Sequence, residues 1–385
     1  MDPCRIVLVA GARPNFIKIA PIARVLAREQ SVFSSILVHT GQHYDAEMSD
    51  VFFDELGIPR PDFNLQVGSG SHARQTAAVM TGFEEVLLKT RPDMVLVVGD
   101  VNSTFACAMA AAKLHIPVAH VEAGLRSFDR TMPEEINRVL TDQISDWLFV
   151  TEESAEANLA REGIDPARVH FVGNVMIDTL LSCREHARRL GVPAALGLKE
   201  TPYAVLTLHR PHNVDESEVF EQIMQGVDYI SQDLVVVFPM HPRTRPSVLA
   251  SNGAAAMLDS GRLRLVEPLG YLEFLGLIER SETVLTDSGG VQEETTVLGV
   301  PCLTLRPNTE RPVTVSEGTN RIVGTSAHRI IEAWEGIKAT PPPAGRRPKL
   351  WDGKAAERIV EVLRREYEGR AATAPQHQMA AKLVG

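Results

Sequence analysis

The stretch of sequence with the most specific chemistry is a serine followed by two glycines, Ser288, Gly289 and Gly290, between a short apolar run and an amphipathic one. A strand that passes through two glycines directly into a helix lets backbone amides approach a diphosphate without Cβ atoms in the way, and the helix dipole favours the negative charge. One of Glu293 and Glu294, a turn further along, could accept hydrogen bonds from ribose hydroxyls. The pattern favours a diphosphate site over a purely structural glycine turn.

A second candidate anion site follows the first apolar run of the chain. Arg13 and Lys18 stand on either side of a predicted turn and helix start that opens with Gly11. Amides at a helix start attract phosphate oxygens, and so do Arg and Lys side chains. Two solvated cations beside a turn are the alternative, but the position at the carboxyl end of a strand favours the anion site.

Two carboxylates stand at the ends of neighbouring predicted strands. Asp100 follows the strand 94–98, and we expect Ser103 to cap the next helix; Asp100 by itself is equally consistent with a turn residue. Glu122 ends the next strand, where burial of an unpaired carboxylate is costly. Either Arg126 neutralises Glu122, or a raised pKa of Glu122 serves catalysis.

Further polar residues stand at the start of a predicted helix and at the ends of predicted strands. Glu134 and Arg138 lie on one face of a predicted helix, a spacing typical of a surface ion pair unless the helix faces the cleft. His209 and His241 each end a predicted strand and could act as general acid–base groups or as anion donors. Neither histidine is accompanied by a set of metal ligands, so we predict no metal site.

Short apolar runs alternate with longer amphipathic stretches through most of the chain, which predicts parallel sheets covered by helices on both faces, the doubly wound α/β arrangement. The predicted strands are 5–10, 36–40, 94–98, 118–121, 147–151 and 169–172 in the first half, and 204–208, 234–238, 263–266, 283–286 and 302–305 in the second.

The length of 385 residues predicts two domains, because single hydrophobic cores stop growing at about 250–300 residues. The pattern loosens after Gly173, so we expect an N-terminal Rossmann-like domain over 1–173 and a second one over 174–351 that contains the candidate diphosphate site, with a ligand-binding cleft between them. We further expect a helix over 352–370 that packs back on the first domain, and a disordered tail over 371–385.

Composition excludes several classes of protein. The formal net charge of −10 argues against broad binding of nucleic acid or of an anionic membrane, although a small basic pocket could hold an acidic ligand. Four widely spaced cysteines suggest neither disulfides nor a zinc site and point to a reduced, cytoplasmic protein. No apolar stretch reaches the roughly 20 residues that a membrane helix requires.

The segment 68–73 fits the pattern G-x-G-x-x-A of dinucleotide-binding proteins, but no clear strand precedes it and no acid follows at the expected place. We interpret this segment as a flexible loop before a helix. Nicotinamide enzymes and P-loop ATPases are therefore disfavoured.

Taken together, these segments resemble the non-hydrolysing UDP-N-acetylglucosamine 2-epimerases over residues from about 5 to 325. The motifs that carry the resemblance are Gly11-Ala-Arg-Pro with Lys18, Thr40-Gly-Gln-His43, Gly99-Asp100, His120-Val-Glu-Ala-Gly-Leu-Arg126, Pro133-Glu-Glu-Ile-Asn-Arg138, Thr286-Asp-Ser-Gly-Gly-Val-Gln-Glu-Glu294 and Thr309-Glu-Arg-Pro312. The resemblance implies two domains of the glycosyltransferase-B type, a homodimer, and reversible conversion of UDP-GlcNAc to UDP-ManNAc. The reaction would eliminate UDP to give a 2-acetamidoglucal and add UDP back, with neither a nicotinamide cofactor nor a metal.

The resemblance also implies roles for single residues. The diphosphate would be held by Arg13, Lys18, Ser288, Gly289 and Gly290, the ribose by Glu294, and other parts of the nucleotide by Phe274 and Arg311. The acid–base carboxylates would be Asp100, Glu122 and Glu134, with His209 in the catalytic group and Arg138 supporting the sugar and the departing UDP; we expect His241 to contact the substrate as well.

Several alternatives stay open at this point. They are a hydrolysing epimerase that releases ManNAc and UDP, an epimerase of a related 2,3-diacetamido UDP-sugar, a UDP-sugar glycosyltransferase, and a nucleotide-sugar binding module without catalysis. Tyr44 and Asp45 depart from the sequence that many bacterial members have near their allosteric site. We therefore expect weak or absent activation by a second substrate molecule.

Overall fold

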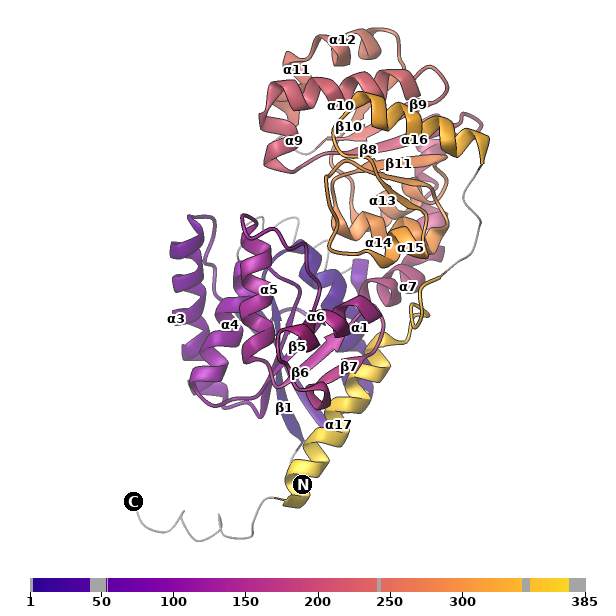
Figure 1. Cartoon of the computed structure of the whole chain (residues 1–385). Helices are drawn as coiled ribbons and strands as arrows, with labels where there is room; N and C mark the ends of the chain where they lie inside the picture. The colour runs from indigo at the N-terminus through magenta and orange to yellow at the C-terminus, as the bar shows by residue number, and fades with distance from the viewer. Residues whose placement is uncertain (1–2, 42–52, 54, 241–243, 341–346, 374–385) are drawn as a thin grey trace, which may run out of the picture.

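The computed structural model describes residues 3–41, 53, 55–240, 244–340 and 347–373, and it contains two parallel sheets in two lobes (Figure 1). The strands of the seven-stranded sheet follow the order β3-β2-β1-β4-β5-β6-β7, and those of the six-stranded sheet the order β10-β9-β8-β11-β12-β13. Both are the order of the doubly wound Rossmann fold, in which the chain starts at the middle of the sheet and moves outward twice.

The strand bounds show where the predictions succeeded. The first sheet consists of β1 (Cys4–Ala10), β2 (Phe33–His39), β3 (Phe63–Asn64), β4 (Met94–Val98), β5 (Val118–Ala123), β6 (Trp147–Val150) and β7 (Val169–Phe171), and the second of β8 (Tyr203–Thr207), β9 (Val235–Pro239), β10 (Leu263–Val266), β11 (Thr283–Thr286), β12 (Cys302–Thr304) and β13 (Asn320–Ile322). Every predicted strand overlaps one of these. The two that the prediction missed, β3 and β13, are short edge strands without a continuous apolar run.

The helices between the strands cover both faces of each sheet. They are α1 (Arg13–Arg28), α3 (His72–Thr90), α4 (Asn102–Lys113), α5 (Pro133–Ile144), α6 (Glu153–Arg161), α7 (Val175–Leu190), α8 (Val192–Ala195), α9 (Pro211–Asp215), α10 (Ser217–Ile230), α11 (Arg245–Ala250), α12 (Asn252–Asp259), α13 (Tyr271–Ile278), α14 (Gly289–Leu298), α15 (Val313–Ser316), α16 (Ala327–Ala339) and α17 (Ala355–Thr373), with a 3-10 turn at Pro166–Arg168. Residues 68–71 form the loop expected before a helix, and α3 begins within the segment at His72; the short edge strand β3 precedes this loop.

Alternation along β1 explains why the first sheet is buried on both faces. Ile6 and Leu8 point into one apolar cluster with α1 and α17, whereas Val7 and Val9 point into another with α3 and α4. Successive side chains of a strand face opposite sides, so an uninterrupted apolar strand requires cover on both.

A single apolar cluster continues from the first lobe into the second along α7. Ile177 and Leu180 of this helix belong to the same cluster as Ile19 of α1 and Leu275 of α13. The lobes are therefore joined by packed side chains as well as by the chain itself.

Helix α17 lies along the first lobe, although it comes last in the sequence (Figure 1). The Asp178 side chain of α7 accepts hydrogen bonds from the amides of Ala355 and Ala356, which begin α17. Ile359 and Leu363 are then buried in the cluster that α1 shares. The helix ends at Thr373, three residues beyond the predicted limit of 370, and the remainder of the predicted tail lies outside the described residues.

Candidate active site

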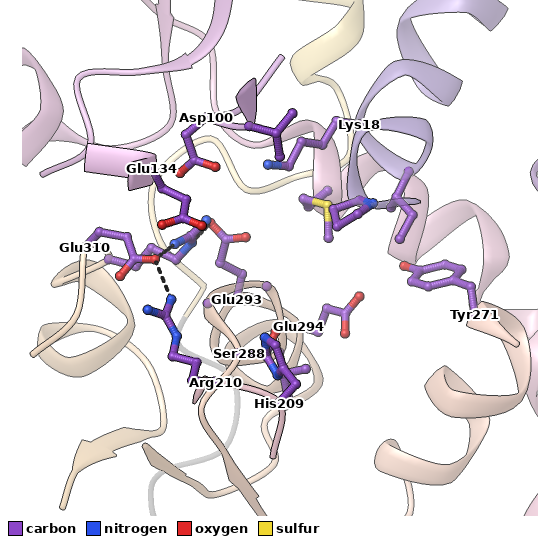
Figure 2. A pocket seen from close by; sticks show the side chains of 18 of the residues that line it. Lys18, Asp100, Glu134, His209, Arg210, Tyr271, Ser288, Glu293, Glu294 and Glu310 are labelled. Atoms are coloured by element: carbon purple, nitrogen blue, oxygen red, sulfur yellow. Dashed lines mark hydrogen bonds and ion pairs between the residues drawn. The ribbon is translucent and has the colours of Figure 1, made fainter. Parts of the chain in front are cut away.

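A cavity of about 480 Å³ lies between the lobes, at the carboxyl ends of strands from both sheets. Figure 2 shows side chains of the two lobes pointing into it from opposite sides. The predicted site residues that line this cavity are Lys18, Asp100, Glu134, Arg138, His209, Phe274, Ser288, Gly289, Gly290, Glu294 and Arg311. Ligands of open α/β sheets bind at this edge, so the fold brings most of the predicted residues to the expected place.

Three predicted residues are placed differently or lie outside the description. Glu122 does not belong to the described lining of the cavity but lies one layer behind it, in contact with Lys18 and Arg311. Arg13 is the first residue of α1, and its side chain is not described. His241 lies outside the described residues, as do Tyr44 and Asp45.

The serine and glycines form the predicted link between a strand and a helix. β11 ends at Thr286, Ser288 takes the N-cap position, and α14 begins with Gly289 and Gly290. A Cβ atom on Gly289 would lie 2.5 Å from Nη1 of Arg311, whereas one on Gly290 would meet only the Met176 Cε at 3.5 Å. A side chain at position 289 would therefore collide with a cation of the cavity, while position 290 has room for one.

Asp287, which sequence reasoning missed, joins the two strand ends of the second lobe. Its carboxylate accepts hydrogen bonds from the amides of His209 and Arg210 and lies 2.7 Å from the His209 Nδ1. Burial acts to raise the pKa of Asp287, but the hydrogen bonds and charge of His209 outweigh it, so the pKa is lowered. A carboxylate directly before Ser-Gly-Gly at a strand end was the signal available in the sequence.

Arg311 connects the lobes at the floor of the cavity. Its guanidinium lies 2.7 Å from carboxylate oxygens of Glu122 in the first lobe and of Glu293 and Glu310 in the second. Neighbouring Arg311 and Arg306 hold the pKa of Glu310 far below its usual range despite burial. Glu310 was not among the predicted site residues, although the Thr309-Glu-Arg-Pro312 motif contains it and its partners Arg306 and Arg311 are close to it in sequence.

Glu122 receives its positive partners from outside its own segment, which corrects one prediction. Its carboxylate pairs with Lys18 and Arg311, while Arg126 pairs instead with Asp142 and Glu162. The backbone at Glu122 has a φ of 73°, and the pairing of β5 with β6 shifts register at this point. This irregular turn sends Glu122 toward α1 and Arg126 toward α6.

Two further expectations are wrong in detail. Arg138 pairs with Asp100 and Glu135 rather than with Glu134, because α5 turns its buried face toward the end of β4 and leaves Glu134 in the cavity. Ser103 does not cap α4: the helix already begins at Asn102, and the Ser103 hydroxyl lies 2.7 Å from the Thr40 Oγ1.

The carboxyl groups of the cavity differ in charge state. Burial alone would raise the pKa of Asp100, but Arg138 and Lys18 lower it, so this group is ionised at neutral pH. At Glu294 no cation of the described residues opposes burial, and burial and the charge of Glu293 raise its pKa to about 8. Tyr271, which the sequence did not single out, borders Glu294 in the cavity (Figure 2).

A model of the family described as UDP-N-acetylglucosamine 2-epimerase matches residues 26–364. The chain belongs to the UDP-N-acetylglucosamine 2-epimerase family. A UDP-N-acetylglucosamine 2-epimerase of Methanocaldococcus jannaschii is 45% identical over 361 residues, which is 92% of this chain and 98% of the relative. A UDP-2,3-diacetamido-2,3-dideoxy-D-glucuronate 2-epimerase of Pseudomonas aeruginosa is 42% identical over 363 residues, 93% of this chain and 99% of the relative.

Solved structures of epimerases in this family have the same fold. The M. jannaschii UDP-GlcNAc 2-epimerase in complex with UDP-GlcNAc and UDP matches with a TM-score of 0.85 at 43% identity, covering 93% of this chain and 99% of that one. The Neisseria meningitidis enzyme bound to UDP-GlcNAc matches with a TM-score of 0.85 at 32% identity and the same two coverages. The expected pair of Rossmann-like domains of the glycosyltransferase-B type is confirmed.

The described residues of this epimerase-family chain contain no group of three or more His, Cys, Asp or Glu side chains suited to holding a metal ion. None of the described helices combines the length and apolar character needed to cross a bilayer.

Proposed function

We propose that this protein interconverts UDP-GlcNAc and UDP-ManNAc by eliminating UDP across C1 and C2 of the sugar and adding it back. The observation that carries the proposal is the cavity itself, where Asp100 and Glu134 of one lobe face the glycine-led start of α14 in the other. The M. jannaschii UDP-N-acetylglucosamine 2-epimerase, 45% identical over 92% of this chain, supports the proposal. The residue roles below are part of the proposal.

The leaving diphosphate takes the negative charge as the C1–O bond breaks. The amides at the start of α14, together with Lys18 and Arg311, supply hydrogen bonds and positive charge at that place. Donors already aimed at a developing charge are usually the largest electrostatic contribution to catalysis. They are needed here because the C2 hydrogen has no adjacent carbonyl to acidify it.

Asp100 and Glu134 are the acid–base groups that line the cavity. Inversion at C2 requires a proton to leave from one face of the sugar and a proton to arrive on the other, which is a physical reason for more than one carboxylate. Asp100 is ionised beside Arg138 and can accept the proton, while Glu134 lies in the first turn of α5 and faces the same cavity.

Glu122 takes part through an exchange of partners. In the free protein its carboxylate binds Lys18 and Arg311, the cations assigned to the diphosphate. A bound diphosphate competes for both cations and so releases Glu122 as a third acid–base group beside the substrate. Binding of the substrate thereby prepares the chemistry.

The second lobe holds the nucleoside and the sugar. Glu294 is largely protonated near neutral pH, because its pKa is about 8, so it can donate to a ribose hydroxyl as well as accept from one. Phe274 offers an apolar surface to the nucleotide, and His209, fixed by Asp287, is placed to support the sugar. Arg13 and His241 are proposed as further contacts of the substrate.

The test is incubation of the protein with UDP-GlcNAc alone in D₂O, followed by proton and phosphorus NMR. UDP-ManNAc with deuterium at C2 is the expected result, since the proton removed exchanges with solvent before return. Free ManNAc and UDP would instead identify a hydrolysing epimerase. Turnover only after addition of a sugar acceptor would identify a glycosyltransferase.

A second candidate substrate is a UDP-2,3-diacetamido uronic acid. It is favoured by the P. aeruginosa UDP-2,3-diacetamido-2,3-dideoxy-D-glucuronate 2-epimerase, which is 42% identical to this chain. The two substrates present the same C1 and C2 to the enzyme but differ at C3 and C6. A comparison of kcat/KM for both UDP-sugars, under identical conditions, decides between them. The homodimer and the cytoplasmic location that we expect from the sequence stay predictions, the first to be checked by sedimentation.

A further inference from the structure

A histidine and an aspartate form a fully buried pair behind the cavity. His120 lies on β5 and Asp142 in the last turn of α5, and neither side chain is exposed at all. The His120 Nδ1 lies 2.7 Å from the Asp142 Oδ1. Neither residue belongs to the described cavity lining, so the proposed reaction gives them no direct role.

The partners of the pair decide how many protons the ring carries. The His120 Nε2 lies 2.8 Å from the carbonyl oxygen of Gly99, which can only accept a hydrogen bond, so Nε2 bears a hydrogen. Asp142 also accepts from the Gly124 amide at 3.1 Å and lies 2.7 Å from the Arg126 Nη2. The guanidinium and the amide on Oδ2 favour the ionised form of Asp142, so its Oδ1 accepts from Nδ1 and the ring carries a hydrogen on both nitrogens.

Charges from three neighbouring elements balance this buried cation. Asp142 comes from α5, Arg126 from the segment after β5, and Glu162 from the residue after α6, where it binds Arg126 at 2.7 Å. The four groups carry two positive and two negative charges. Burial acts to raise the pKa of Asp142, but His120 and Arg126 lower it. Buried charges that are paired and hydrogen-bonded in this way avoid the cost of an isolated one.

The pair holds the two turns that deliver carboxylates to the site. Gly99 precedes Asp100, and Gly124 follows Glu122 by two residues; both glycines have a left-handed backbone, with φ of 69° and 77°. His120 binds the carbonyl of the first glycine and Asp142 the amide of the second. The ends of β4 and β5 are thus fixed to the same two side chains.

The turn at Gly99 has little freedom to move without disturbing the site. A Cβ atom there would lie 2.9 Å from the Lys18 Nζ and 3.5 Å from Glu122 Oε2, so the turn lies beside that ion pair with no room for a side chain. Helix α5 completes the connection, because its Asn137 side chain donates to the carbonyl of Asp100 at 2.9 Å. Glu134 lies in the first turn of this helix, and Asp142 lies in its last turn.

We propose that His120 and Asp142 are positioning residues, whose charged pair locks the turns carrying Asp100 and Glu122 to α5 so that the three acid–base carboxylates keep one geometry. The inference rests on the proposed function, since it assigns those carboxylates to the reaction. It makes the doubly protonated ring a requirement for fast turnover without any contact to the substrate.

Two matched variants test this on the full-length protein. Asn at position 120 places its amide near the Nδ1 and can bind Asp142 but not Gly99, whereas Gln extends to the Nε2 position and can donate to the Gly99 carbonyl. We expect His120→Asn to lower kcat for UDP-GlcNAc about 100-fold, as misplacement by about 1 Å can do, with KM changed less than about threefold. We expect His120→Gln to recover about tenfold of that loss.

Equal kcat values for the two variants, or a loss confined to KM, would overturn the proposal. A melting temperature measured for each variant separates lost positioning from lost folding. If both variants unfold, ¹⁵N NMR of His120 in the wild-type protein at neutral pH still tests the proposal. Two protonated ring nitrogens are the expected result, and a neutral imidazole would contradict the inference. A wild-type protein that turns over no UDP-GlcNAc overturns the proposed function instead, while this NMR measurement continues to test the charged pair.

Discussion

Two carboxyl groups on opposite sides of the cavity, Asp100 of the first lobe and Glu294 of the second, have opposite electrostatic surroundings. On the first-lobe side, Asp100 and Glu122 each lie against a cation, and burial is offset by ion pairs. On the second-lobe side, the start of α14 presents backbone amides, and Glu294 is buried beside Glu293, with no cation of the described residues acting on its pKa. The pKa of Asp100 is accordingly lowered, whereas that of Glu294 is raised to about 8.

For these two groups the neighbouring charges decide the direction of the pKa shift: Arg138 and Lys18 lower the pKa of Asp100, whereas the charge of Glu293 adds to burial at Glu294. Ionised carboxylates in fixed positions suit proton transfer from carbon. Amides and a neutral carboxyl suit a nucleotide that brings its own negative charge. We therefore propose that the first lobe supplies most of the acid–base groups and the second lobe most of the contacts to the leaving group.

The largest effect should come from removing charge on the first-lobe side. Glu122→Gln should lower turnover of UDP-GlcNAc by about 10²–10⁴-fold, the usual contribution of a general acid–base group. The affinity for UDP should stay the same or rise, because Lys18 and Arg311 lose a competing carboxylate. Steady-state kinetics and calorimetric titration with UDP measure the two effects separately.

Glu279→Gln is the matched control for this variant. Glu279 is likewise a largely buried carboxylate bound by two cations, but its partners Arg184 and Arg188 do not belong to the described lining of the cavity, whereas Lys18 and Arg311 do. Its activity should remain close to that of the wild type. Wild-type activity in Glu122→Gln, or an equal loss in both variants, would break the assignment of chemistry to the first lobe.

A smaller effect is expected from steric change on the second-lobe side. Gly289→Ala introduces a methyl group 2.5 Å from the Nη1 of Arg311, which three carboxylates hold in place. Displacement of this cation should weaken UDP binding by about 10–100-fold, the value of one hydrogen bond to a charged group. Calorimetric titration with UDP provides the measurement.

Gly290→Ala gives the comparison that makes the result interpretable. Its methyl group meets only the Met176 Cε at 3.5 Å, an ordinary contact, while it gains the same helix propensity as the first substitution. UDP binding should change much less than in Gly289→Ala. Similar losses in the two variants would show that flexibility of the helix start, rather than the position of Arg311, controls affinity.

The smallest expected effect concerns stability and pH. Because the pKa of Glu294 is about 8 in the folded protein and near 4.5 when unperturbed, the folded state binds the extra proton between these values. Stability from this group is thus complete at low pH and is lost as the pH rises toward 8, where a buried charge forms.

Glu294→Gln removes that loss, since a Gln side chain stays neutral. The variant and the wild type should melt at similar temperatures near about pH 5, and the variant should melt a few degrees higher near about pH 9. Thermal unfolding of both proteins across this range is the measurement. A difference that is constant with pH would mean that Glu294 is ionised throughout, and the contrast between the two sides of the cavity would be lost.

Much of the fold follows from local sequence. Uninterrupted apolar runs such as Met94–Val98 can be buried only in a sheet covered on both faces, so their alternation with amphipathic stretches predicted the architecture. The glycines at 289 and 290 indicated a helix start open to a diphosphate for an equally local reason. The short edge strands β3 and β13 were missed because they contain too few apolar residues to form a pattern.

The partners of the charged residues were decided by the tertiary structure. Local spacing suggested Arg126 for Glu122 and Glu134 for Arg138, yet Glu122 binds Lys18 and Arg311, 104 and 189 residues away. Coulomb attraction depends on distance in space, and the crossovers of two sheets bring remote strand ends together. The sequence by itself thus determined which residues reach the edge of each sheet, whereas the packing of the two lobes determined which charges meet there and which carboxyl groups keep their protons.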